Sequence, residues 1–130
     1  MATVLVVDDS NVMRRLLLAS LVKAGLKAEQ LVEASDGRES LEAIRSHGGI
    51  DLVMCDLCMP NMDGVELLDA LREDQLLEGL SVVIVTGDAD ESRAQEALAH
   101  GAQRLLPKPF SPQLLKETLT ELLGASSSNP

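Results

Sequence analysis

Short runs of apolar residues alternate along the chain with longer segments whose apolar residues recur every three or four positions. The short runs are typical of buried strands and the longer segments of amphipathic helices. We expect strands at residues 4–7, 30–34, 52–55, 82–85 and 104–106, each followed by a helix. The pattern therefore predicts five strands and five helices in a repeated strand–helix order.

Capping residues mark the expected ends of these helices. An Asp or Ser side chain can accept hydrogen bonds from the first helical turn, and Gly readily adopts the left-handed conformation that ends a helix. Asp9 or Ser10 can therefore begin the first helix, and Gly25 can end it. The remaining signals are Asp36 and Asp63 for the second and third helices, Glu91 to His100 before Gly101 for the fourth, and Ser111-Pro112 for the fifth.

The first helix is expected to pack an apolar stripe against the sheet. That stripe comprises Met13, Leu16, Leu17, Leu21 and Val22. Arg14 and Arg15 lie between these positions, and we expect them to form a solvated helix face, with a docking surface as the alternative.

Strands that alternate with helices are expected to pair in parallel, because the helix supplies the crossover that parallel pairing requires. The runs at 4–7, 52–55 and 82–85 are almost wholly apolar, which is typical of central strands covered on both faces. The runs at 30–34 and 104–106 are more polar or shorter and belong at the edges. The order 2-1-3-4-5 satisfies this, which predicts a flavodoxin-like, doubly wound (βα)5 fold of the α/β class.

Length and charge limit the kind of protein. The 130 residues fit one domain, placed at residues 1–123, and residues 124–130 are expected to form a flexible tail because they carry little apolar surface. Acidic residues outnumber basic ones 21 to 11, and the net charge of −10 disfavours nucleic acid or an anionic membrane as a partner. We therefore expect protein partners. We also expect the chain to be a monomer or a weak dimer.

The N-terminal residues have neither a basic region nor a long apolar stretch, since the first apolar run is interrupted at Asp8. We therefore expect no signal peptide and no membrane span, and we interpret the protein as cytoplasmic.

Three carboxylates follow two of the central strands. Asp8 and Asp9 come directly after the first run, and Asp56 follows the third. At one sheet edge they would repel one another unless a cation offset their charge. Magnesium suits such a set because it takes oxygen ligands, whereas zinc and iron favour His or Cys. The alternative is that each Asp only caps a helix.

Thr86 and Lys108 follow the fourth and fifth strands. Lys108 lies between Pro107 and Pro109, which restrict the local backbone and allow a cis bond at Lys108-Pro109. A fixed ammonium beside magnesium would neutralise the oxygens of a transferring phosphoryl group. The alternatives are a solvated Lys and a Thr that is only a good strand former.

The ordered set of motifs resembles the response-regulator receiver domain of the CheY-like type, over about residues 3 to 123. The motifs are Val6-Val7-Asp8-Asp9-Ser10, Asp56 with residues 59–64, Val85-Thr86, Gly101-Ala102 and residues 107–110. Asp8-Asp9-Ser10 followed by residues 13–15, together with residues 59–64, looks most like the single-domain chemotaxis group.

This resemblance implies a role for each site residue. Asp56 would be the phosphoacceptor, taking a phosphoryl group from a histidine kinase or a histidine phosphotransfer protein. Asp9 and Asp56 would bind Mg²⁺ directly, Asp8 would act through water, and the backbone carbonyl of Cys58 would complete the protein ligands.

The resemblance also implies a switch. Lys108 would pair with the phosphoryl group and Thr86 would move to hydrogen-bond it, rearranging the face of the fourth helix, fifth strand and fifth helix where a downstream partner binds. Receivers usually have Tyr or Phe at the position of Leu105, so we expect backbone shifts around Thr86 to replace a moving ring. Cys58 and Asp88 are expected to tune the lifetime of the phosphoryl group.

Other functions stay open at this point. A phosphohydrolase with an aspartyl-phosphate intermediate would typically carry an acid where this chain has Cys58, so no separate substrate turnover is expected. A phosphorylation-independent interaction module is kept open by Leu105. The chain could also be the receiver piece of a larger hybrid kinase or regulator. We set aside a redox or zinc role for the Cys55–Cys58 spacing, since no second pair or nearby His completes it.

Overall fold

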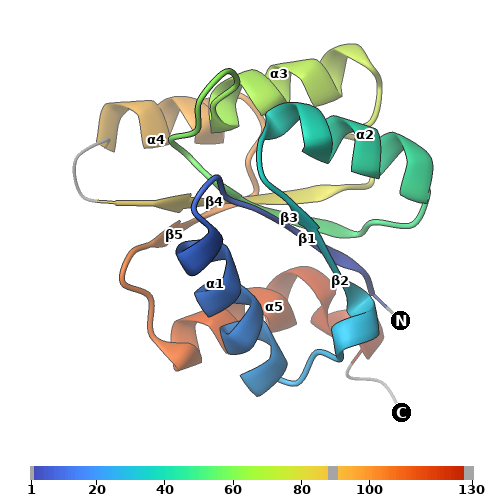
Figure 1. Cartoon of the computed structure of the whole chain (residues 1–130), viewed down its shortest axis with the longest axis vertical. Helices are drawn as coiled ribbons and strands as arrows, with labels where there is room; N and C mark the ends of the chain where they lie inside the picture. The colour runs from blue at the N-terminus through green and yellow to red at the C-terminus, as the bar shows by residue number, and fades with distance from the viewer. Residues whose placement is uncertain (1, 88–90, 128–130) are drawn as a thin grey trace.

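A five-stranded parallel sheet forms the middle of the molecule, with helices on both of its faces (Figure 1). The computed structural model describes residues 2–87 and 91–127. The strands are β1 (Val4–Val7), β2 (Leu31–Ala34), β3 (Leu52–Asp56), β4 (Ser81–Thr86) and β5 (Arg104–Pro107). The helices are α1 (Asn11–Lys23), α2 (Gly37–His47), α3 (Gly64–Glu73), α4 (Glu91–Ala99) and α5 (Pro112–Ser127), with a short 3-10 helix, η1 (Ala28–Gln30), before β2.

The strand order is β2-β1-β3-β4-β5, and every neighbouring pair is parallel. The predicted doubly wound order is therefore confirmed. Because β1 lies between β2 and β3, the winding reverses there, and ligands of such sheets bind at the carboxyl ends of the strands beside that reversal.

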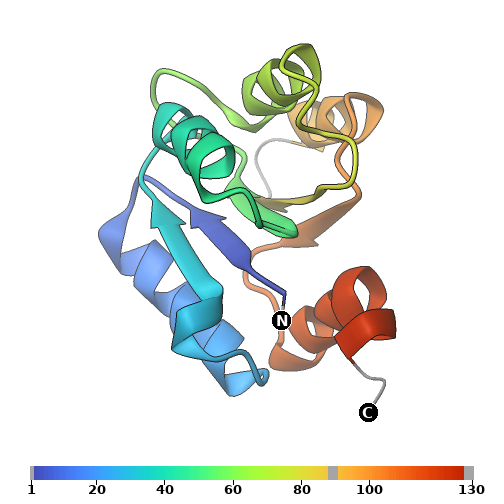
Figure 2. The same ribbon diagram turned by 90° about the vertical axis from the view of Figure 1, so that its right-hand side faces the viewer.

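The central strands alternate their side chains between two cores. In β1, Leu5 and Val7 face the core under α2, α3 and α4, whereas Val4 and Val6 face the core under α1 and α5. Figures 1 and 2 show these two helix layers on opposite sides of the sheet. All four side chains are fully buried, which explains why the central runs are apolar at every position.

Side-chain caps begin the helices where the sequence predicts them. The Ser10 hydroxyl accepts a hydrogen bond from the first turn of α1, so Ser10 rather than Asp9 is the cap. Asp36 and Asp63 accept the corresponding bonds in α2 and α3, and Ser111 does so in α5. These caps fix where the chain leaves the strand ends, which is where the predicted site lies.

The predicted buried stripe of α1 is partly wrong. Leu17 and Leu21 are buried, but Leu16 is 57% exposed and Val22 is 49% exposed. Leu17 and Leu21 are four residues apart and already fill the space over the sheet and beside α5, so Leu16 and Val22 point away from it. The exposed apolar side chains on this side of α1 are Val12, Leu16, Ala19 and Val22, which we call the α1 stripe.

One strand boundary also differs from the prediction. Gln30 belongs to η1 rather than to β2, and its side chain bonds the backbone of Ala2 and Lys27. Helix α5 continues to Ser127, and the domain bounds of residues 1–123 stay a prediction. The flexibility of the tail stays a prediction, and residues 128–130 lie outside the described residues. No helix within the described ranges is long and apolar enough to cross a membrane.

Leu17 and Leu16 offer a test of this packing, because they are neighbours in α1 with 6% and 57% exposure. Leu17→Ala should lower the free energy of unfolding by about 2–4 kcal/mol, since it leaves a cavity between α1 and the sheet. Leu16→Ala should change it by less than about 0.5 kcal/mol. Urea unfolding followed by circular dichroism measures both values, and equal losses would contradict the packing of α1.

Candidate functional site

The carboxylates of Asp8, Asp9 and Asp56 lie together at the carboxyl ends of β1 and β3. One oxygen from each lies within 4.8 Å of the others. The register explains this, because Val7 pairs with Cys55, so the residues that follow each strand are side by side. Asp8 is buried, Asp56 is half-buried and Asp9 is exposed. The expected convergence of the three acids is confirmed, while their individual roles stay predictions.

This donor set fits magnesium. All three groups offer carboxylate oxygens, which a hard divalent cation prefers, and the exposure of Asp9 leaves the cluster accessible to water. The Asp8 carboxylate is already oriented, because its Oδ1 accepts a hydrogen bond from the Ser10 backbone N–H at 2.9 Å. Asp8, Asp9 and Asp56 could therefore hold the ion that the sequence predicts.

Opposing influences act on the Asp56 carboxylate. Burial raises its pKa above the usual range, and the nearby charge of Asp8 raises it further. Lys108 opposes this through its charge and through a hydrogen bond of 3.2 Å from Nζ to Oδ1, and a backbone hydrogen bond from Cys58 acts in the same direction. The net shift is upward, so the ionised Asp56 lacks part of the compensation that a cation would supply.

Lys108 and Thr86 reach the same edge through β5 and β4. Thr86 is buried and follows Val85, the β4 partner of Asp56 in the sheet register. The Lys108 backbone N–H donates to the Thr86 carbonyl at 2.6 Å, and the Lys108-Pro109 peptide bond is cis. Both predicted residues are therefore brought to the edge where the acids lie.

The loop between β3 and α3 is held close to the strand ends. The Leu57 backbone donates to the Val85 carbonyl, and the Gly64 backbone donates to the Leu57 carbonyl. A Cβ on Gly64 would lie 3.0 Å from Ile84 and 3.4 Å from the Leu57 Cα, so a larger residue there would press on this loop. Cys58 is exposed on the loop, and the predicted role of its carbonyl toward Mg²⁺ stays a prediction.

Arg14 is a site residue that sequence reasoning missed. Its side chain is only 14% exposed, so the expectation of a solvated face is wrong for this residue. Its guanidinium donates to the Asp8 carbonyl at 2.7 Å, to Glu33 of β2 at 2.9 Å and to Asn11 at 2.5 Å. Glu33 on the neighbouring edge strand was the signal that could have revealed this contact. Arg15, in contrast, is exposed.

Arg93 of α4 is a second unanticipated contact. It donates to Asp63 through Nε at 3.0 Å and Nη2 at 2.7 Å, while Nη1 contacts Glu96. Asp63 is also the N-cap of α3, at the end of the loop that follows Asp56. The loop that follows Asp56 is therefore joined to α4 by an ion pair.

The remaining candidate positions have ordinary environments or fall outside the described residues. Leu105 is half-buried, pairs with Ile84 and packs against the core beneath α4. Burial, followed by the charges of Asp56 and other nearby acids, raises the pKa of the Cys55 thiol well above its usual range, so the thiol stays protonated. Asp88 lies outside the described residues.

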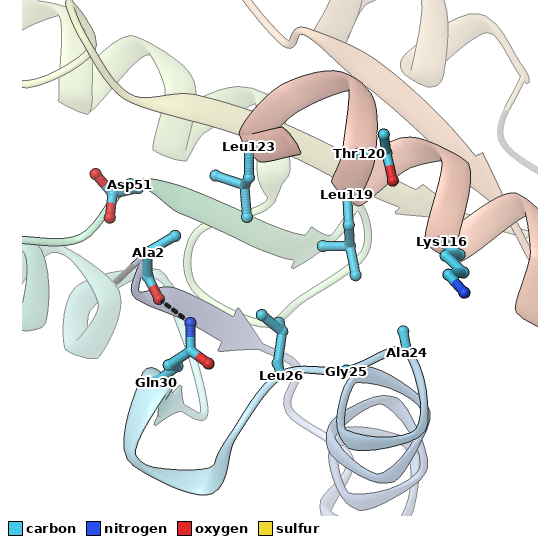
Figure 3. A pocket seen from close by; sticks show the side chains of 10 residues that line it. All are labelled: Ala2, Ala24, Gly25, Leu26, Gln30, Asp51, Lys116, Leu119, Thr120 and Leu123. Atoms are coloured by element: carbon cyan, nitrogen blue, oxygen red, sulfur yellow. Dashed lines mark hydrogen bonds between the residues drawn. The ribbon is translucent and has the colours of Figure 1, made fainter. Parts of the chain in front are cut away.

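A surface hollow of about 750 Å³ lies at the opposite end of the sheet, between the end of α1 and α5 (Figure 3). Two of its polar side chains already have backbone partners, because Gln30 donates to the Ala2 carbonyl and Asp51 accepts from the Thr3 N–H. The hollow is remote from the acids and forms no part of the site.

Comparison with known proteins agrees with this geometry. Residues 4–120 match the model of the response regulator receiver domain, so the chain belongs to that family of two-component signalling domains. The chain is 33% identical to the chemotaxis protein CheY homolog of Campylobacter jejuni, over 95% of this chain and 93% of that protein. It is 36% identical to the chemotaxis protein CheY of Pseudomonas aeruginosa, over 92% and 94% of the two chains.

Solved structures have the same fold. Vibrio cholerae chemotaxis protein CheY4 superposes with a TM-score of 0.79 at 35% identity, over 95% of this chain and 99% of that one. A probable two-component system response regulator/GGDEF domain protein superposes with a TM-score of 0.86 at 33% identity, over 98% of this chain. The present chain spans about half of that protein, 51% of its length.

The raised pKa of Asp56 predicts that its charge opposes folding. When a carboxyl has a higher pKa in the folded than in the unfolded protein, the folded protein loses stability as the pH rises through the folded-state pKa. Asp56→Asn should therefore raise Tm by about 2–5 °C at pH 7 without Mg²⁺, a change of roughly 1 kcal/mol. The gain should shrink as the pH falls through the raised pKa and vanish below the unfolded-state pKa.

Differential scanning calorimetry at several pH values measures this effect. Glu117→Gln is the matched control, because it removes one exposed carboxylate on α5 and should leave Tm nearly unchanged. Added Mg²⁺ should stabilise the wild type more than Asp56→Asn, since ligand binding to the native state raises its stability. A lower Tm for Asp56→Asn at pH 7 would contradict the electrostatic account.

Proposed function

We propose that this receiver is a phosphorylatable switch of a two-component phosphorelay, with Asp56 as the phosphoacceptor. The observation that carries the proposal is the cluster of Asp8, Asp9 and Asp56 oxygens within 4.8 Å of one another, with Lys108 Nζ 3.2 Å from Asp56. A nucleophilic carboxylate, a site for Mg²⁺ and a fixed ammonium are the groups that phosphoryl transfer to Asp requires.

The donor would be the phosphohistidine of a histidine kinase or of a histidine phosphotransfer protein. An oxygen of ionised Asp56 attacks phosphorus, the O–P bond forms as the P–N bond breaks, and the imidazole nitrogen keeps the bonding electrons. Lys108 contacts the transferring phosphoryl oxygens and offsets their charge.

Magnesium would neutralise charge on the same oxygens. Asp9 and Asp56 would bind it directly, and Asp8 would act through a water molecule. The Cys58 carbonyl would complete the protein ligands, since Cys58 lies two residues after the phosphoacceptor and its backbone already bonds the Asp56 carboxylate.

Thr86 would transmit phosphorylation of Asp56 to the neighbouring strands and helices. Its carbonyl accepts the Lys108 backbone N–H at 2.6 Å, so the ends of β4 and β5 are coupled at the backbone. A Thr86 hydroxyl drawn toward the phosphoryl group would shift this pair and the face formed by α4, β5 and α5, where a downstream partner would bind. Leu105 supplies no aromatic ring for the movement, so the backbone carries it.

The α1 stripe offers a second partner surface. Val12 and Leu16 are 69% and 57% exposed, and α1 begins directly after the acidic turn. A protein donor must approach that turn closely to deliver its phosphoryl group. We propose that the donor packs on the α1 stripe, while the downstream partner uses the face of α4, β5 and α5.

The relatives named as chemotaxis proteins support a chemotaxis role. The main alternative is the receiver piece of a larger hybrid kinase or regulator, supported by the match to half of the response regulator/GGDEF domain protein. In either setting we propose a cytoplasmic signalling protein, a monomer or weak dimer, that catalyses its own phosphorylation and dephosphorylation without turnover of a separate substrate.

Acetyl phosphate or phosphoramidate with Mg²⁺ should phosphorylate the protein at Asp56. Intact-mass spectrometry should detect one added phosphoryl group, and peptide mapping after borohydride trapping should locate it. Asp56→Asn should abolish the adduct, and chelation of Mg²⁺ should suppress it. Asp51→Asn is the matched control, because Asp51 lies at the opposite end of β3 and should leave phosphorylation intact.

An adduct that persists in Asp56→Asn would reject Asp56 as the acceptor. Repeated turnover of a phosphomonoester would favour a phosphohydrolase instead. A partner that binds equally well with and without beryllofluoride would favour the phosphorylation-independent module.

Leu16→Gln should separate docking from chemistry. It should slow phosphotransfer from the histidine kinase that phosphorylates the wild type fastest, by about tenfold in kcat/KM, since truncating an apolar interface residue costs about 1–2 kcal/mol. The rate with acetyl phosphate should not change, because that donor needs no docking surface. Gln113→Ala, an exposed change at the start of α5, is the control. Equal rates with the kinase would exclude the α1 stripe as the donor surface.

A further inference from the structure

The turn between β1 and α1 carries two of the three acids, and its backbone is held from both sides. The Asp8 N–H donates to the Ala34 carbonyl at the end of β2, at 3.2 Å. The Asp8 carbonyl accepts from Arg14 Nη1 at 2.7 Å. That carbonyl belongs to the peptide that joins Asp8 to Asp9, so Arg14 fixes the peptide plane from which Asp9 projects.

Asp9 depends on this backbone more than Asp8 does. The Asp8 carboxylate is buried and bonded by the Ser10 N–H, whereas Asp9 is exposed and makes no hydrogen bond or ion pair with the rest of the described chain. Among the described residues, no partner of the side chain therefore holds the Asp9 carboxylate near Asp56. Its position follows from the backbone of the turn.

We infer that Arg14 is a positioning residue for the metal-binding acids, which it holds by fixing the backbone between Asp8 and Asp9. The inference rests on the proposed function, since that function requires the acids to bind Mg²⁺. A guanidinium suits the task because its donors form a rigid planar fork, and here the fork spans the Asp8 carbonyl, Asn11 and Glu33. With its side chain 14% exposed, Arg14 is shielded from competition with water.

A positioning role and a purely electrostatic effect of Arg14 predict opposite changes in Mg²⁺ affinity when Arg14 is replaced. A cation beside three carboxylates repels an incoming Mg²⁺, so if charge dominated, removing it would strengthen Mg²⁺ binding. If positioning dominates, removing it loosens the turn, lets Asp9 leave the cluster and weakens Mg²⁺ binding. The sign of the change therefore identifies the role.

Isothermal titration of the unphosphorylated protein with MgCl₂ gives the dissociation constant directly. Arg14→Gln should raise that constant about tenfold, the lower end of the usual effect of groups that orient metal ligands. Arg14→Lys should raise it similarly, because Lys keeps the charge but cannot span the three acceptors. Arg15→Gln is the matched control, since it removes the same charge from an exposed neighbour and should leave the constant unchanged.

Unchanged or tighter Mg²⁺ binding by Arg14→Gln would overturn the inference, and so would wild-type affinity in Arg14→Lys. Leu17→Ala guards against a general loss of stability, because it destabilises the same helix away from the turn. It should keep the wild-type dissociation constant, and a tenfold loss there too would also overturn the inference.

The two proposals fail separately. A wild type that binds Mg²⁺ with the predicted Arg14 dependence but takes no phosphoryl group from acetyl phosphate would reject the phosphorelay function and leave Arg14 as a positioning residue. If the wild type is phosphorylated on Asp56 and Arg14→Gln binds Mg²⁺ with the same affinity, the phosphorelay function stands and the positioning role of Arg14 is rejected.

Discussion

Mutual repulsion among Asp8, Asp9 and Asp56 is the constraint on which the rest of the site depends. Three carboxylates with oxygens within 4.8 Å of one another are unfavourable unless something offsets their charge. Lys108 offsets part of it, yet the pKa of Asp56 is still raised by burial and by Asp8. The fold therefore holds a site that is short of positive charge, a deficit that a divalent cation would relieve.

The scaffold keeps this strained cluster in place by burying what lies behind it. β1 and β3 are packed from both faces, and Val7 and Cys55, the paired residues just before the acids, are both fully buried. Moving the backbone of Asp8 or Asp56 away from this edge would pull these residues out of the core, whereas Asp9 is one residue further from the strand and is exposed. Apolar burial in the sheet thus sustains an electrostatic cost at its edge, an arrangement typical of functional sites.

The sequence predicts this part well because it depends on periodicity and on strand order. The apolar runs place β1, β3 and β4 in the centre, and parallel pairing then brings Asp8, Asp9, Asp56 and Thr86 to one edge. The sequence predicts contacts between helices and strands poorly. The sequence suggests a solvated Arg14, but β2 places Glu33 beside it. It also suggests a buried Leu16, but Leu17 and Leu21 already fill the space. Such contacts depend on helix rotation, which one apolar stripe does not determine.

Transmission of a change at Asp56 to the protein surface would depend on other contacts than the proposed phosphoryl transfer does. A half-buried Leu105 cannot report the site by exchanging a polar ring edge between core and solvent, as Tyr could. Polar couplings between described residues at the same edge include the backbone bond between Lys108 and Thr86 and the ion pair that joins Asp63 to Arg93 of α4. Both attach directly to segments that flank Asp56. Any displacement of the loop between Asp56 and Asp63 must therefore move α4 with it or break a charged contact, so α4 is coupled to the acidic cluster without an aromatic residue.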